Sequence, residues 1–187
     1  MTAETPARMI VVKKEEKEPR LRQLILDGLA AAACTGTPVV LRILAQSLSS
    51  PVARAANGLN VQLAAAGIQA LVILAKTDPQ PSSQFGAHTS WRHLADVRCF
   101  DAHELLVLGS QTAWTGDCLR REPATRDSYE LHAPHSPDMA VLVARSFDRL
   151  WLKSLALEAR EVGCHLGITA NLAALAVEAP PQVLTRH

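Results

Sequence analysis

Four arginines close together in the sequence could bind a phosphate group: Arg98, Arg120, Arg121 and Arg126. A guanidinium group holds a phosphate through two parallel hydrogen bonds, so these side chains predict a site for a phosphate or a nucleotide. In the competing interpretation they lie on a solvated loop and pair with neighbouring carboxylates, because exposed ion pairs are common. Those carboxylates are Asp117, Glu122 and Asp127.

Two further residue types could do chemistry in the same region. Trp114 could stack on a nucleic-acid base, or it could pack the segment around it. Ser110 and His103 could act as nucleophile and base, but the Gly-x-Ser-x-Gly turn that presents a nucleophilic serine is absent. The sequence therefore does not favour a hydrolase of that type.

The sequence predicts no metal and no cofactor. His132 and His135 stand in one predicted turn and could bind a metal with Cys118 or Asp138, but no fourth ligand is indicated. No Gly-x4-Gly-Lys-Ser/Thr loop and no Gly-x-Gly-x-x-Gly turn occurs, which argues against a nucleotide hydrolase and a dehydrogenase.

Length and composition indicate one domain with a single core. The chain has 187 residues, 48% of them hydrophobic, and a formal net charge of +1 that creates no field attracting nucleic acid or membranes. Its longest apolar run, residues 59–75, is interrupted by polar residues and predicts no membrane span. The N-terminus lacks the pattern of a signal peptide, so we expect a cytoplasmic protein. The alanine-rich, arginine-rich composition is typical of a GC-rich bacterial genome.

Hydrophobic spacing predicts an alternation of helices and strands in the first half of the chain. A helix is expected from Leu21 until Gly36, and a buried strand over residues 38–44. Ser50 and Pro51 then start a helix that ends at Gly67, with Ser50 as its cap, and residues 68–75 form a second buried strand. This order predicts a parallel βαβ unit.

The second half is predicted to begin with a loop over residues 77–89. Strands are expected at 97–100 and 104–108, a polar loop at 115–126, and an edge strand at 128–132. A helix starts at Ser136 and continues to about Gly163, with an apolar stripe of Met139, Leu142, Val143, Phe147, Leu150 and Trp151. The domain organisation follows: a mobile charged arm (1–18), an α/β domain (19–153) and a C-terminal helical extension (154–187).

The order of these segments resembles the phospholipase D-like superfamily over residues 20–153. The resemblance depends on Leu105 to Thr112 with its Gly109-Ser110, on Tyr129-Glu130, and on Phe147 to Trp151. In that family an apolar strand runs into Gly-Ser-x-Asn, an Asn-x-Glu element follows, and a helix ends in Phe…Leu-Trp. The resemblance implies an α/β sandwich with a mixed, mostly parallel central sheet flanked by helices.

The family's catalytic motif, His-x-Lys-x4-Asp just upstream of the Gly-Ser, is not matched. Its histidine attacks phosphorus or protonates the leaving oxygen, and its lysine stabilises the phosphoryl charge. Aligned on Asp101, the motif places Leu94 at the histidine and Asp96 at the lysine, while His93 is one residue out of register. Thr112 stands in place of the asparagine after Gly-Ser.

The resemblance therefore implies a catalytically silent domain that acts as a binding or structural module, pairs as a homodimer, and binds a protein partner or a phosphate-bearing ligand. The alternative is a phosphodiesterase or nuclease that uses His93 or His103 in a rearranged site. Nucleic-acid binding through the arginine loop is a third possibility. The expected ligand-binding residues are Arg98, Asp101, Ser110, Thr112, Trp114, Arg120, Arg121 and Glu130.

Overall fold

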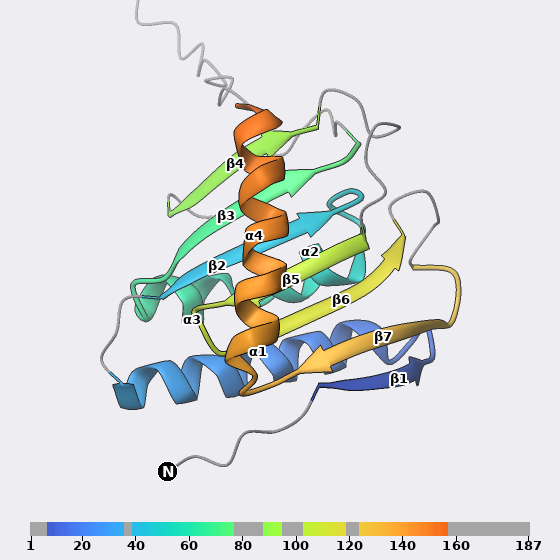
Figure 1. Cartoon of the computed structure of the whole chain (residues 1–187), viewed down its shortest axis with the longest axis horizontal. Helices are drawn as coiled ribbons and strands as arrows, with labels where there is room; N and C mark the ends of the chain where they lie inside the picture. Colours follow the sequence, from blue (N-terminus) through green and yellow to red (C-terminus); the bar gives the residue numbers. More distant parts are fainter. Residues whose placement is uncertain (1–6, 36–38, 77–87, 95–102, 119–123, 157–187) are drawn as a thin grey trace, which may run out of the picture.

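The computed structural model describes residues 7–35, 39–76, 88–94, 103–118 and 124–156 (Figure 1). Its strands are β1 (Arg8–Val12), β2 (Val40–Ala45), β3 (Gln69–Leu74), β4 (Thr89–His93), β5 (His103–Leu108), β6 (Thr112–Cys118), β7 (Ser128–Ala133) and β8 (Leu155–Ala156). Its helices are α1 (Lys17–Thr35), α2 (Pro51–Asn57), α3 (Asn60–Ala65) and α4 (Pro137–Lys153).

All the strands of the described parts form one mixed sheet, in the order β1-β7-β6-β5-β2-β3-β4-β8. The predicted α/β sandwich with a mixed sheet between helices is confirmed. The expectation of a mostly parallel sheet is wrong: only β2 with β3 and β3 with β4 are parallel pairs, and all other neighbours are antiparallel. The reason is that a short turn, residues 109–111, joins β5 to β6, and a turn of that length reverses the chain.

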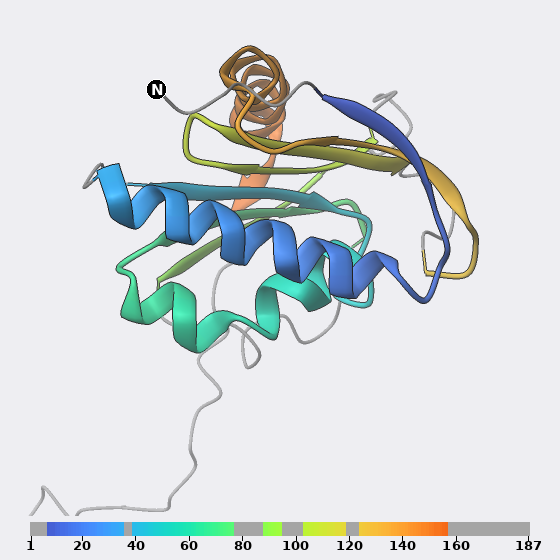
Figure 2. The same ribbon diagram turned by 90° about the horizontal axis from the view of Figure 1, so that it is seen from below.

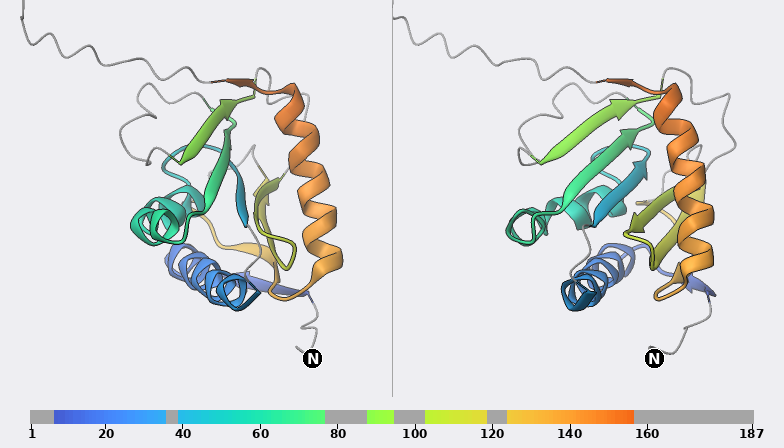
Figure 3. Two further views of the ribbon diagram at one scale, coloured as in Figure 1. Left: turned by 90° about the vertical axis from the view of Figure 1, so that its left-hand side faces the viewer. Right: turned by 60° about the vertical axis from the view of Figure 1, so that its left-hand side comes forward.

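Helices cover both faces of the sheet (Figures 2 and 3). The face under α1, α2 and α3, called the α1 face below, buries Ile43, Val72 and Leu106. The opposite α4 face buries Leu44, Ile73 and other side chains against α4. Neighbouring residues of one strand therefore enter different cores, which explains why these strands are apolar on both sides in the sequence.

The βαβ prediction is confirmed, because β2 and β3 are parallel from Val40 opposite Gln69 to Ala45 opposite Leu74. The single helix expected between them is divided into α2 and α3. At the division a Cβ on Gly58 would lie 2.2 Å from Nη2 of Arg22, so glycine admits the guanidinium of α1 at this point. Ser50 does not cap α2 with its side chain, since its hydroxyl accepts a hydrogen bond from the Ser47 amide instead.

The predicted N-terminal arm is wrong over its described residues. The apolar stretch at Met9 forms β1, an edge strand that pairs with β7, and the charge run leads directly into α1. The backbone amide of Lys14 donates to Asp127 Oδ1 over 2.9 Å, which ties this connection to the segment before β7. Local charge indicated solvation, but the sheet edge supplies backbone partners that local composition does not reveal.

Helix α4 begins where it was predicted and buries Val143, Phe147 and Leu150. Leu142 was expected in the buried stripe but is 56% exposed, because it lies one position off the spacing of these three residues. The helix ends at Lys153, and the predicted continuation to Gly163 is wrong where the chain is described: Ser154 is followed by β8. Residues 157–187 lie outside the described part of the chain.

Three further segments, two predicted loops and one predicted edge strand, also differ from their predictions. The loop at 77–89 is followed by β4, whose first residue is Thr89, and residues 77–87 lie outside the described part. The prediction of a polar loop over residues 115–126 is wrong at its start, because β6 continues to Cys118. The strand at 128–132 is present as β7 but is not an edge, since β1 covers it. The strand expected at 97–100 lies outside the described residues.

None of the helices in the described parts of the chain is long and apolar enough to cross a membrane.

Replacement of Phe147 by alanine tests the core under α4. The side chain is fully buried and stacks on Trp151 with ring centroids 5.6 Å apart. We expect Phe147→Ala to lower the free energy of unfolding in urea by about 3–5 kcal/mol, because it removes apolar burial and leaves a cavity. Leu152→Ala on the same helix is the control, since Leu152 is 82% exposed. Equal losses for the two variants would contradict the assignment of this core.

Candidate functional site

Several strands bring polar residues to one edge of the sheet. Strands β2, β3 and β4 end at this edge, whereas β5 and β7 run antiparallel to their neighbours and begin there. We call this row of strand ends the site edge, as distinct from the edge strands β1 and β8. It is defined by the residues that flank or begin these strands: Gln46, Lys76, His93, His103 and Ser128. In open α/β sheets ligands bind outside the carboxyl ends of parallel strands, so this edge is the candidate functional site.

Glu130 is the centre of a buried polar group on the α1 face, next to the site edge. Its side chain is fully buried, and Oε2 accepts a hydrogen bond from the indole Nε1 of Trp114 over 2.9 Å. Nε2 of His132 lies 3.0 Å from the same oxygen, and the Ser128 hydroxyl donates to Oε1 over 3.3 Å. The carboxylate is thus occupied by partners from its own strand and from β6.

Trp114 packs inside the domain. It is 2% exposed, and its indole lies across Gly116, where a Cβ would approach Cζ2 of the indole to 2.1 Å. Only glycine at this position allows the ring to reach Glu130. The packing interpretation of Trp114 is therefore confirmed, and the indole has no free face on which a base could stack.

Glu104 is a second buried carboxylate on the α1 face. It is 1% exposed, and Oε1 accepts a hydrogen bond from the backbone amide of Gln46 over 2.7 Å. Sequence analysis did not select it as a site residue. A signal was present, because an acidic residue within the apolar run of β5 must be buried with polar partners. Lys17, at the start of α1, is also only 1% exposed, and nothing in its charged surroundings in the sequence indicated this burial.

The predicted site residues do not come together. Ser110 is exposed in the turn between β5 and β6, and Thr112 is buried at the start of β6, so both lie at the opposite edge from His103. The five-residue separation of His103 and Leu108 along β5 corresponds to about 16 Å, which excludes Ser110 and His103 as a nucleophile and base pair. Arg98, Asp101, Arg120 and Arg121 lie outside the described residues.

The two histidines considered for catalysis also lie apart. His93 ends β4 and His103 begins β5, and β3 and β2 lie between these strands. Three inter-strand spacings amount to about 14 Å, so the two imidazoles of one chain cannot flank a single phosphate. Within the described ranges, no three histidine, cysteine or acidic side chains gather as metal ligands.

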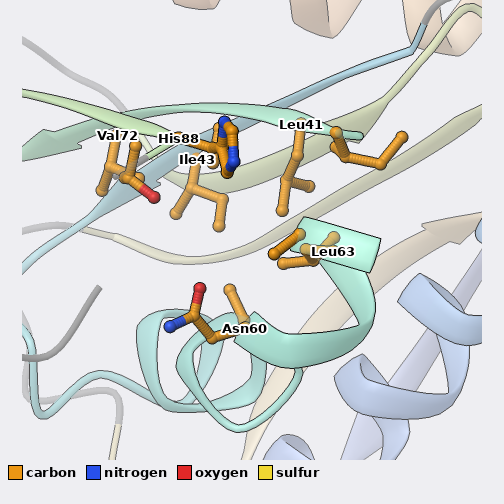
Figure 4. Close-up of a pocket in the computed structure, with 11 residues that line it drawn as sticks. Leu41, Ile43, Asn60, Leu63, Val72 and His88 are labelled. Atoms are coloured by element: carbon orange, nitrogen blue, oxygen red, sulfur yellow. The ribbon is translucent and has the colours of Figure 1, made fainter. Parts of the chain in front are cut away.

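A small pocket lies away from the site edge, between α3 and the starts of β2, β3 and β4 (Figure 4). Aliphatic side chains such as Leu41, Leu63 and Val72 line it, and Asn60 and His88 approach it from the helix side and the strand side. The described side chains that line it are mainly aliphatic, and His88 is the ionisable one among them.

Comparisons with known proteins identify the fold. No protein-family model matches the sequence, and no curated protein matches it. NucT from Helicobacter pylori superposes with a TM-score of 0.55 at 13% identity, over 81% of this chain and 99% of NucT. Nuc from Salmonella typhimurium, a phospholipase D family member, superposes with a TM-score of 0.50 at 12% identity and the same coverage. The chain has the phospholipase D-like fold.

A third solved structure is matched over only part of its length. TrmBL2, an archaeal chromatin protein with a novel mode of DNA binding, gives a TM-score of 0.58 at 10% identity, over 84% of this chain and 56% of TrmBL2. At these identities the likeness establishes the fold alone, and it confirms the resemblance inferred from the sequence at that level.

The structure changes how the phospholipase D-like motif is placed on this chain. Gly109-Ser110 forms a hairpin turn, with Gly109 at a φ of +60°, and lies at the edge opposite Glu130. The alignment on Asp101, upstream of this turn, placed Leu94 at the histidine, but Leu94 is 4% exposed in the α4-face core. Asp96 lies outside the described residues. The apolar strand of the resemblance, β5, begins at the same end of the sheet as β7, which carries Glu130, so the start of β5 is the place at which to compare the motif.

The motif His-x-Lys-x4-Asp can be aligned with the start of β5 in two registers. One places Glu104 at the lysine, with Ala102 at the histidine and Gly109 at the aspartate. The other places Leu105 at the lysine, with His103 at the histidine and Ser110 at the aspartate. Neither register places a cation at the lysine position.

Substitution of Trp114 by phenylalanine tests the buried polar group. Trp114→Phe removes the donor to Glu130 while keeping an aromatic ring, so we expect the free energy of unfolding in urea to fall by about 1–3 kcal/mol. Tyr129→Phe, which removes a polar group from a side chain that is 74% exposed, is the matched control and should change little. A loss no larger than that of the control would show that the hydrogen bond between Trp114 and Glu130 is not stabilising.

Proposed function

We propose that the chain is a catalytically silent phospholipase D-like domain that acts as a binding or structural module. The observation that supports this most directly is that neither residue at the motif's lysine position on β5, Glu104 or Leu105, is a lysine or an arginine. Glu104 would repel the phosphate that a lysine holds, and Leu105, which is 4% exposed in the core under α4, is neutral and inaccessible. In either register the charge that stabilises the transferring phosphoryl group is missing.

The surroundings of Glu130 support the same proposal. Its oxygens interact with Trp114, His132 and Ser128, and its side chain is fully buried. A carboxylate can orient a catalytic imidazole from a buried position, but that imidazole must itself reach the substrate. The imidazole beside Glu130, that of His132, is only 13% exposed, and buried Trp114 donates to the same carboxylate oxygen, which favours a structural role for the glutamate.

A phosphodiesterase or nuclease is the second candidate function. The observation in its favour is His103, whose side chain is exposed at the site edge and occupies the motif's histidine position in one register. An exposed imidazole can act as a nucleophile or a general acid. This candidate needs a cation from another part of the chain to stabilise the phosphoryl group, because Leu105 is neutral.

As a module, the domain would pair as a homodimer and bind a protein partner or a phosphate-bearing ligand. TrmBL2 supports a role as a module, because this fold spans only 56% of that protein. DNA binding by TrmBL2 gives nucleic acid some support as the ligand. Arg98, Arg120 and Arg121 would supply the guanidinium groups for a phosphate, and binding through them would weaken steeply with added salt.

Hydrolysis of bis-(p-nitrophenyl) phosphate separates the two candidate functions. We expect the purified full chain to release p-nitrophenol no faster than the buffer, with or without EDTA, because the phosphoryl charge is not stabilised. His103→Ala and His93→Ala are assayed beside it as matched controls. Turnover by the wild type that His103→Ala abolishes would establish the enzyme and refute the proposal.

A further inference from the structure

Three charged side chains are almost completely buried on the α1 face of the sheet. Lys17 and Glu104 are each 1% exposed, and Glu130 is fully buried. Full burial of a charged side chain is rare unless an opposite charge is near, because the charge loses its hydration. Hydrogen-bond partners of the two carboxylates include a backbone amide, an indole, a hydroxyl and an imidazole, and none of these four groups carries a permanent positive charge.

The direction of α1 brings Lys17 to the level of these carboxylates. Gly28 approaches β5 at the edge opposite the site edge, where its Cβ would contact Leu108 and Thr112. Lys17 precedes Gly28 by eleven residues, or about 16 Å of helix, and Glu104 precedes Leu108 by about 13 Å of strand. The two side chains therefore lie at the same level of the α1 face.

The connection before α1 gives the same placement independently. β1 ends with Val12 opposite Ser128, and the Lys14 amide binds Asp127, so the chain reaches the site edge just before Lys17. Figure 2 shows α1 beginning beneath the edge where β1 ends and β7 begins. Glu130 lies two residues after Ser128 on that strand.

We infer that Lys17 supplies the positive charge for Glu104 and Glu130, and that this charge cluster fills the place where a phospholipase D-like active site would hold a phosphate. The inference rests on the proposed function for the assignment of Glu104 to the motif's lysine position. The charge at this position of β5 is then the opposite of the charge in the active motif. The active motif puts a lysine on β5 to hold a phosphate, whereas this chain has a carboxylate on β5 and a lysine on α1.

The cluster excludes an anion from its own position. Two carboxylates and one ammonium group leave one negative charge, with His132 at its border as a further titratable group. An entering phosphate would meet both carboxylates and would have to displace Lys17. A phosphate-bearing ligand of this domain therefore binds outside the cluster.

A double-mutant cycle on the full chain tests the inference. Lys17→Met, Glu104→Gln and the double variant are compared with the wild type by thermal unfolding. We expect each single substitution to lower Tm and the double variant to lower it by clearly less than the two losses added, because Glu104→Gln removes a charge that Lys17→Met leaves unbalanced. Lys13→Met, which removes an exposed lysine of the same segment, is the control and should leave Tm unchanged.

The outcomes against the inference are an additive cycle and a Lys17→Met variant with an unchanged Tm. If Lys17→Met does not fold, a variant that also carries Glu104→Gln and Glu130→Gln, and so removes all three charges, should regain a cooperative transition, and its failure to do so also overturns the inference. The same preparations are assayed with bis-(p-nitrophenyl) phosphate. Turnover by the wild type refutes the proposed function whatever the cycle gives, whereas an additive cycle without turnover refutes the charge cluster alone.

Discussion

The central strands of the sheet are covered by helices on both faces, and this coverage limits where polar side chains can lie. Side chains of β2, β3 and β5 alternate between the core under α1 to α3 and the core under α4. A polar side chain on either face must then find its partners inside the protein, since water does not reach it. Glu104 and Glu130 on the α1 face are the residues most affected, and their partners come from the end of β2, from β6 and from β7.

This constraint explains how one fold accommodates different chemistry at the same place. The sandwich requires apolar cores on both faces of the sheet, and it tolerates any polar group at the strand ends that has partners or solvent. Near the site edge, Gly116 leaves room for the indole of Trp114 to lie over β6 and donate to Glu130. Under the proposed function, the backbone arrangement would be preserved while the groups that contact a phosphate would be replaced by groups that contact one another.

The elements with strong local signals were predictable from the sequence, and the relations between elements were not. The βαβ unit and α4 followed from hydrophobic spacing, and the order of segments indicated the phospholipase D-like fold. The position of the motif failed at Gly109-Ser110, because a glycine after an apolar run can end a strand or turn a hairpin. Only the pairing of β5 with β6 decides between these, and that pairing depends on residues distant from the turn. The burial of Lys17 likewise depends on where β1 and α1 dock on the sheet, which a charge run does not encode.

A buried cluster of the kind inferred around Lys17 contributes more to the specificity of the fold than to its stability. Desolvation of the charges offsets most of their attraction, whereas leaving one charge without its partner costs about 3–5 kcal/mol. Apolar contacts of Leu21 and Ile25 with the sheet would tolerate a small shift of α1, because they have no directional requirement. A displaced Lys17 would leave two buried carboxylates without a cation, so the charges select one position of α1 on the sheet. In a domain without a catalytic motif, the site edge would then serve to hold the N-terminal helix in place.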